Sequence, residues 1–153
     1  MKVALCHLEL SNGPEQKNIE LLEKAVRIAA EKGANWVITP ETAVQGYYFY
    51  KLEPATKVDK QPSSKLSFLL SLVKDYGLFL FLGCGEYDSE LNCNFNSCIV
   101  FEPSGEICGR HRKIISHGIG AESWARTADV LKPIDCLNTV SYTHLTLPTI
   151  LRV

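Results

Sequence analysis

The sequence lacks the segments that would send a chain across a membrane or out of the cell. It has no charged stretch followed by an apolar one at its start, and no apolar run approaches ~18 residues. We therefore expect neither a signal peptide nor a membrane span. The net charge is only -1 over 153 residues, which provides no electrostatic attraction to nucleic acid or an anionic membrane surface. A soluble, cytoplasmic protein with neither partner is expected.

The six cysteines also lack the spacing of a zinc site or a disulfide framework. The sequence contains no CxxC pair, and without a secretory signal the thiols are expected to be reduced. A structural zinc site would favour tight ligand pairs, whereas the candidate ligands lie in strand-like runs where small buried cysteines are common. We therefore expect no metal and no cofactor. The ligands considered are Cys84, Cys93, Cys98, Cys108 and His111.

What the sequence does contain is the pattern of one α/β domain. Apolar residues make up 46% and charged residues 22% of the chain, which is a globular composition with enough apolar residues for a core. Strands and helices alternate and are followed by an antiparallel pair joined by a Pro-Ser-Gly turn. The run 78–83 is apolar on both faces and should be the central strand. The expected strands are 2–10, 35–39, 78–83 and two within 95–113. The first expected helix is capped at Ser11 or Asn12, has Pro14 and Glu15 in its first turn and closes at Gly33, and the second spans 63–77. The expected connections are 51–65 and 85–93.

Three charged residues occupy positions where catalytic groups collect. Glu41 follows a strand and a proline, beside Tyr47 and Tyr48, and a carboxylate there could act as a general base. Lys113 ends a strand and could stabilise a developing oxyanion, and Glu122 lies on a glycine-rich loop where it could orient a lysine or a substrate. Tyr47 is a candidate wall of the substrate pocket. Each residue also has an ordinary reading, as a solvated loop acid, an edge lysine, an ion-paired glutamate or a core aromatic.

Taken together, these segments resemble a known family. The set TPETAVQGY, GCGEY, FNSCIVFEPSGEI, GRHRKI and GAESW is similar to the nitrilase, or carbon–nitrogen hydrolase, superfamily. The resemblance covers residues 1 to about 139 in order. It implies an α-β-β-α sandwich, of which this chain would supply the N-terminal half only. It also implies a Glu–Lys–Cys catalytic triad supported by a second glutamate.

The resemblance assigns roles to individual residues. Glu41 matches the first glutamate, Lys113 the lysine and Glu122 the second glutamate, while Asn96 and Ser97 match the aromatic-Asn-Ser start of a strand. By this resemblance, the glutamate takes a proton from the cysteine thiol and later activates water. The lysine stabilises the charge of the tetrahedral intermediate.

The cysteine of the triad has no match in the sequence. The family places it after a strand that follows the second glutamate. Cys136 falls before that expected strand and is interpreted as part of the connection, and the other five cysteines precede Lys113. We therefore expect the nucleophile to be missing from this chain.

The end of the sequence offers an explanation. VSYTHLTLPT, residues 140–149, resembles the conceptual translation of a transposase adapter used in preparing sequencing libraries. The alternative is a genuine strand rich in threonine and leucine. We predict that residues 1–139 are a truncated carbon–nitrogen hydrolase domain and that 140–153 are a non-native tail. Such a fragment should be inactive and should expose apolar faces such as residues 78–82.

The function implied for the parent protein is hydrolysis of a non-peptide carbon–nitrogen bond in a small amide, nitrile or carbamoyl compound. The resemblance also implies a homo-oligomer when the protein is full length. The alternative is a non-catalytic nitrilase-like protein that binds a ligand or partner through the same pocket, and it predicts a native gene without the cysteine.

Overall fold

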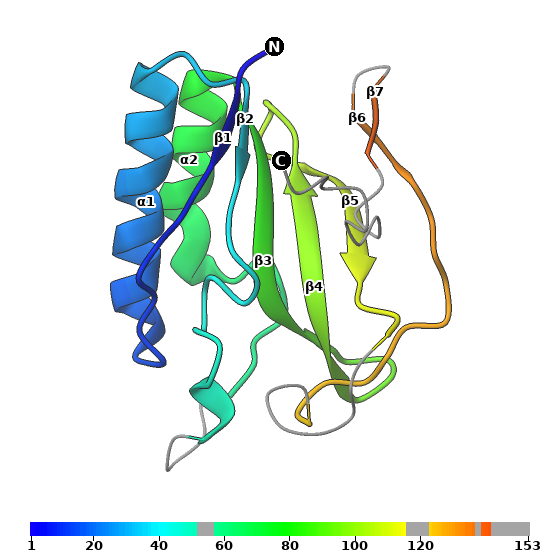
Figure 1. Cartoon of the computed structure of the whole chain (residues 1–153). Coiled ribbons are helices and arrows are strands. Elements are labelled where there is room, and N and C mark those ends of the chain that lie inside the picture. The colour runs from blue at the N-terminus through cyan, green and yellow to red at the C-terminus, as the bar shows by residue number, and fades with distance from the viewer. Residues whose placement is uncertain (52–56, 116–122, 137–138, 142–153) are drawn as a thin grey trace, which may run out of the picture.

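Two helices cover one face of a five-stranded mixed sheet (Figure 1). The computed structural model describes residues 1–51, 57–115, 123–136 and 139–141. Strands β1, β2 and β3 are parallel, and β3, β4 and β5 are antiparallel. This arrangement confirms the expected α/β class. The sheet order is β1 (Val3–Leu5), β2 (Trp36–Ile38), β3 (Phe79–Asp88), β4 (Cys93–Phe101) and β5 (Ile107–Arg112); the helices are α1 (Glu15–Glu31) and α2 (Ser67–Tyr76), with short 3-10 turns at Phe49–Lys51 and Ser64–Leu66.

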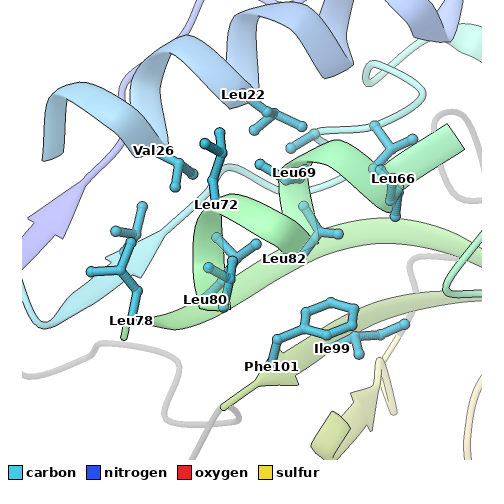
Figure 2. Packing of buried hydrophobic residues seen from close by; sticks show 14 of the residues in the cluster. Leu22, Val26, Leu66, Leu69, Leu72, Leu78, Leu80, Leu82, Ile99 and Phe101 are labelled. Atoms are coloured by element: carbon cyan, nitrogen blue, oxygen red, sulfur yellow. The ribbon is translucent and has the colours of Figure 1, made fainter. Parts of the chain in front are cut away.

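The helix face of the sheet, which is the face turned toward α1 and α2, carries the larger core. Leucines and valines recur at helical spacing on both helices and meet alternate residues of β3 and β4 (Figure 2). Each fully buried leucine contributes roughly 1.5–3 kcal/mol, so this layer accounts for much of the stability. Both helices end at glycines with positive φ, Gly33 at +77° and Gly77 at +63°. The labelled core residues are Leu22, Val26, Leu66, Leu69, Leu72, Leu78, Leu80, Leu82, Ile99 and Phe101.

Strand β3 lies at the centre of the sheet, as its apolar sequence predicts, but it is longer than expected. It continues to Asp88, and β4 begins at Cys93, so most of the segment expected to be a connection is strand. The physical reason is that Glu86 within this segment is buried and has cationic partners in the fold. At the other end, β1 stops at Leu5 although the apolar pattern extends to residue 10.

The opposite face of the sheet, called the inner face below, carries a smaller apolar cluster. Phe79, Phe81 and Val100 pack there with Ile134 of strand β6 (Ile134–Cys136). A Cβ atom at Gly109 of β5 would lie 2.5 Å from Ile134 Cγ2, so the glycine allows β6 to cross the sheet closely. In Figure 1, β6 and β7 lie on the side of the sheet away from the helices.

This packing corrects one expectation. The residues of the segment 78–82 are each at most 5% exposed, whereas the sequence alone suggested an exposed apolar face. Strand β6 also pairs with β7 (Thr139–Ser141), so the strand pairing of the described structure extends past residue 139. Residues 142–153 lie outside the described residues. Within the described part of the chain, no helix has the length and apolar character needed to cross a membrane.

Candidate active site

The loop that carries Glu41 lies directly against the backbone of β3. The Gly83 amide donates to Thr39 Oγ1 at 2.9 Å, and the Ala43 amide donates to the Gly83 carbonyl at 2.7 Å. A Cβ atom at Gly83 would stand 2.2 Å from the Pro40 carbonyl oxygen and 3.0 Å from Glu41 Cα. Only glycine permits this close approach, so the sequence of β3 helps to position the carboxylate.

The residue after Glu41 has an unusual backbone conformation. Thr42 has φ of 49°, in the left-handed region that β-branched residues rarely adopt. Its carbonyl accepts a hydrogen bond from the Gly46 amide at 2.7 Å. From α1, the buried Asn18 side chain donates to the Val44 carbonyl at 3.1 Å. Backbone strain of this kind persists where the surroundings fix the conformation, and it is frequent at functional sites.

Glu41 and Lys113 are brought together from positions 72 residues apart in the sequence. Lys113 Nζ donates to Glu41 Oε1 at 3.0 Å, and the Asn96 side-chain amide donates to the same oxygen at 2.6 Å. Lys113 directly follows β5, where its amide donates to the Asn96 carbonyl at 2.8 Å and its carbonyl accepts from the Ala128 amide at 3.0 Å. The side chains are 40% exposed for Glu41 and 37% for Lys113, so the pair remains accessible.

A cavity of about 500 Å³ opens beside this pair on the inner face. Its lining combines the three polar groups with apolar side chains, which is typical of sites that bind small molecules. A carboxylate, an ammonium and an amide in such a cavity can exchange a proton and stabilise a developing negative charge. Among the described residues, the lining consists of Thr39, Pro40, Glu41, Gly83, Asn96, Ser97, Cys98, His111, Lys113, Ile114, Ile115 and Leu131.

The two other predicted site residues, Tyr47 and Glu122, are not tested by this arrangement. Tyr47 does not contribute to the described lining; it is 41% exposed, and its ring lies edge-on to Tyr48 with a centroid distance of 5.1 Å. Glu122 lies outside the described residues. Trp124, close behind it in sequence, packs edge-on against Phe49 at 4.8 Å. The roles predicted for Tyr47 and Glu122 stay predictions.

Burial raises the thiol pKa of several described cysteines, which makes them poor nucleophiles. Cys98 lines the cavity, but burial raises the pKa of its thiol to about 12. Burial also raises the pKa of Cys108 to about 12 and that of Cys84 well above its ordinary value, and it raises the pKa of Cys136. A thiol needs its thiolate form to attack, so these four are poorly suited to the task. The described residues also contain no group of three His, Cys, Asp or Glu arranged to hold a metal ion.

A second charged cluster lies on the helix face and was not found from the sequence. Glu86 is 2% exposed; it contacts Arg110, accepts hydrogen bonds from Arg112 Nε and Nη2 at 3.0 Å each, and accepts another from Ser97 Oγ at 2.8 Å. Desolvation opposes its ionisation, but the bonds from Arg112 and Ser97 and the charges of both arginines prevail and lower its pKa. A glutamate directly after the apolar run of β3, with two arginines two strands away on β5, was the available signal.

Comparison with known proteins agrees with this geometry. The model of the family described as "Carbon-nitrogen hydrolase" matches residues 2–135. The chain is 31% identical over 116 residues to a nitrilase of Pyrococcus abyssi, covering 74% of this chain and 43% of that protein. It is also 31% identical over 114 residues to the omega-amidase NIT2 of Mus musculus, covering 74% and 40%.

A solved structure extends the likeness to the fold. Nit3 of Saccharomyces cerevisiae, described as a member of branch 10 of the nitrilase superfamily, superposes with a TM-score of 0.76 at 22% identity, covering 90% of this chain and 52% of that one. The present chain thus spans about half the length, or less, of these relatives.

Proposed function

This chain belongs to the carbon-nitrogen hydrolase family, and from that premise we propose that its parent protein hydrolyses a non-peptide carbon–nitrogen bond in a small amide, nitrile or carbamoyl compound. The observation that carries the proposal is the 3.0 Å contact of Lys113 Nζ with Glu41 Oε1 beside a cavity of about 500 Å³. The similarity to a nitrilase and an omega-amidase supports the class of substrate.

For an amide, the proposed reaction has two halves. Glu41 accepts the proton of a cysteine thiol, and the thiolate attacks the carbonyl carbon to form a tetrahedral intermediate. Lys113 stabilises the negative charge on the carbonyl oxygen. The carbon–nitrogen bond then breaks as Glu41 returns the proton to the departing nitrogen, leaving a thioester. In the second half, Glu41 takes a proton from water, which attacks the thioester and releases the acid and the thiol. Glu122 is proposed to support the pair.

The nucleophile is proposed to lie in a segment that this chain does not include. The matched part of this chain covers only 43% and 40% of the two relatives named above, and residues 84, 98, 108 and 136 are cysteines with raised pKa. We accordingly propose that residues 1–139 are the N-terminal part of the domain and that residues 140–153 are a non-native tail.

The decisive experiment is to sequence the source gene across the codon for Thr139 and to express the complete frame. Release of ammonia or carboxylic acid is then measured from a panel of amides, nitriles and carbamoyl compounds. We expect turnover that Glu41→Gln and Lys113→Met each reduce at least about 100-fold. Full activity in Glu41→Gln would contradict the proposed mechanism.

The same experiment decides the alternative. A complete frame without a cysteine after the next strand, combined with tight binding of an amide measured by calorimetry and no turnover, would establish a ligand-binding homologue. The half-exposed Glu41–Lys113 pair would then serve as a recognition site for a polar group of the ligand.

A further inference from the structure

We propose that Asn96 is a positioning residue for the general base, which fixes one oxygen of Glu41 so that the other exchanges the proton. The inference rests on the proposed function and deepens it. Both contacts of the Glu41 carboxylate with the described residues fall on Oε1, from Asn96 Nδ2 at 2.6 Å and from Lys113 Nζ at 3.0 Å. Oε2 is therefore the oxygen assigned to the thiol proton.

Asn96 holds both members of the ion pair. Its side chain donates to Glu41, and its backbone carbonyl accepts from the Lys113 amide at 2.8 Å. The residue is buried in β4, between β3 and β5, where it is paired with Gly85. Because strands hydrogen-bond to β4 on both sides, its amide is presented from a rigid element, as accurate positioning requires.

The chemistry explains why a second donor is needed. Without Asn96, the Glu41 carboxylate could rotate about its last bond and offer either oxygen to Lys113. Two donors on Oε1 favour one rotamer and make that oxygen the poorer proton acceptor. The proton of the thiol then moves to Oε2 and from Oε2 to the departing nitrogen, while the carbon–sulfur bond forms and the carbon–nitrogen bond breaks.

The chain offers a matched control in the next residue. Ser97 also borders the cavity, but its hydroxyl is turned to the helix face, where it donates to Glu86 Oε2 at 2.8 Å. It therefore makes the same kind of bond, from the same strand, to a carboxylate that lies across the sheet from the cavity. A loss of strand stability should affect variants at both positions, whereas a change in base chemistry should follow Asn96 alone.

The test compares Asn96→Ala, Asn96→Asp and Ser97→Ala in the enzyme encoded by the complete gene, with acrylamide-sized amides as substrates. We expect Asn96→Ala to lower kcat at least about tenfold with a smaller change in KM, because hydrogen bonds to charged groups are among the stronger ones. Asn96→Asp keeps the shape of the side chain but removes the donor, so it should lower kcat as well.

The outcomes separate the inference from the proposed function. A loss of kcat in Asn96→Ala that is no greater than that in Ser97→Ala, or a change confined to KM, would overturn the positioning role. An inactive unmutated enzyme would overturn the proposed function instead, and the inference with it. Melting temperatures identify variants that fail to fold. Because aspartate has nearly the shape of asparagine, Asn96→Asp carries the test if Asn96→Ala does not fold.

Discussion

Replacing Gly83 by alanine should disrupt the loop that carries Glu41. The added methyl would stand 2.2 Å from the Pro40 carbonyl oxygen and 3.0 Å from Glu41 Cα, so the loop must move away from β3 by more than 1 Å to reach an ordinary contact distance of ~3.4 Å. That movement would stretch two hydrogen bonds, from the Gly83 amide to Thr39 Oγ1 and from the Ala43 amide to the Gly83 carbonyl.

The expected magnitude follows from these contacts. Overpacking costs about 1–3 kcal/mol, and each of the two hydrogen bonds contributes about 0.5–1.5 kcal/mol. Gly83→Ala should therefore lower the free energy of unfolding by about 2–6 kcal/mol. For a chain of this size, the melting temperature should fall by at least about 4 °C.

The assay is urea unfolding followed by tryptophan fluorescence, with Gly77→Ala as the matched control. Gly77 has φ of +63° and no atom within 4 Å of a Cβ placed there, so its substitution carries only the backbone cost of about 1–2 kcal/mol. Gly83→Ala should be the more destabilising of the two. An equal or smaller effect at Gly83 would show that the loop does not lie against β3 as described, and the account of how Glu41 is positioned would fail.

Three further predictions follow from the charges and thiols. Lys113→Met in the complete enzyme should reduce kcat about 100-fold or more. It should change the free energy of unfolding by less than about 1 kcal/mol, because its partner Glu41 is half-exposed. A large loss of stability would show that the lysine has a structural role instead. Glu86→Gln should destabilise the fold by about 3–5 kcal/mol at neutral pH, because it breaks a buried ion pair. The pKa of Glu86 is lowered from 4.5, so its contribution to the free energy of unfolding is present above that pH and is lost as the pH falls through the lowered value. In urea unfolding, the stability of the variant should therefore decline less in acid than that of the unmutated protein. Equal declines would contradict the assignment. Cys98 and Cys108 have pKa values of about 12, so they should react with iodoacetamide at pH 7.5 at least tenfold more slowly in the native than in the unfolded chain. The rates are measured by mass spectrometry of the alkylated peptides. Equal rates would show that burial does not suppress the reactivity of these thiols.

Much of the fold could be predicted because it depends on local periodicity. The helical spacing through Leu22 and Val26 and the continuous apolar run of β3 identify their elements without tertiary information. The end of β3 could not be predicted in the same way, because Glu86 and Asp88 read as turn residues. In the fold they pair with Phe95 and Cys93 of β4, and Arg112 of β5 contacts both carboxylates; these contacts exist only in the folded chain.

The candidate site was likewise predictable only in part. Glu41 and Lys113 were predicted from their positions at strand ends and from family resemblance, and the structure brings them into contact. The contact between Asn96 and Glu41 could not be predicted, because the choice of one carboxylate oxygen depends on side-chain geometry. Tyr47 was expected at the pocket because it follows Glu41 closely in sequence, yet the turn after Thr42 places it outside the described lining.

The alternation of side chains along β4 and β5 has a consequence for folding. Asn96 and Lys113 serve a carboxylate on the inner face, while the adjacent Ser97 and Arg112 serve Glu86 on the helix face. A one-residue slip in the register of either strand would exchange the two faces. Both carboxylates would lose partners together, and the buried one would be left as an uncompensated charge at a cost of about 3–5 kcal/mol. The residues that assemble the candidate site thus also destabilise mispaired strands, so a chain with a misaligned sheet would lose stability together with the contact between Glu41 and Lys113.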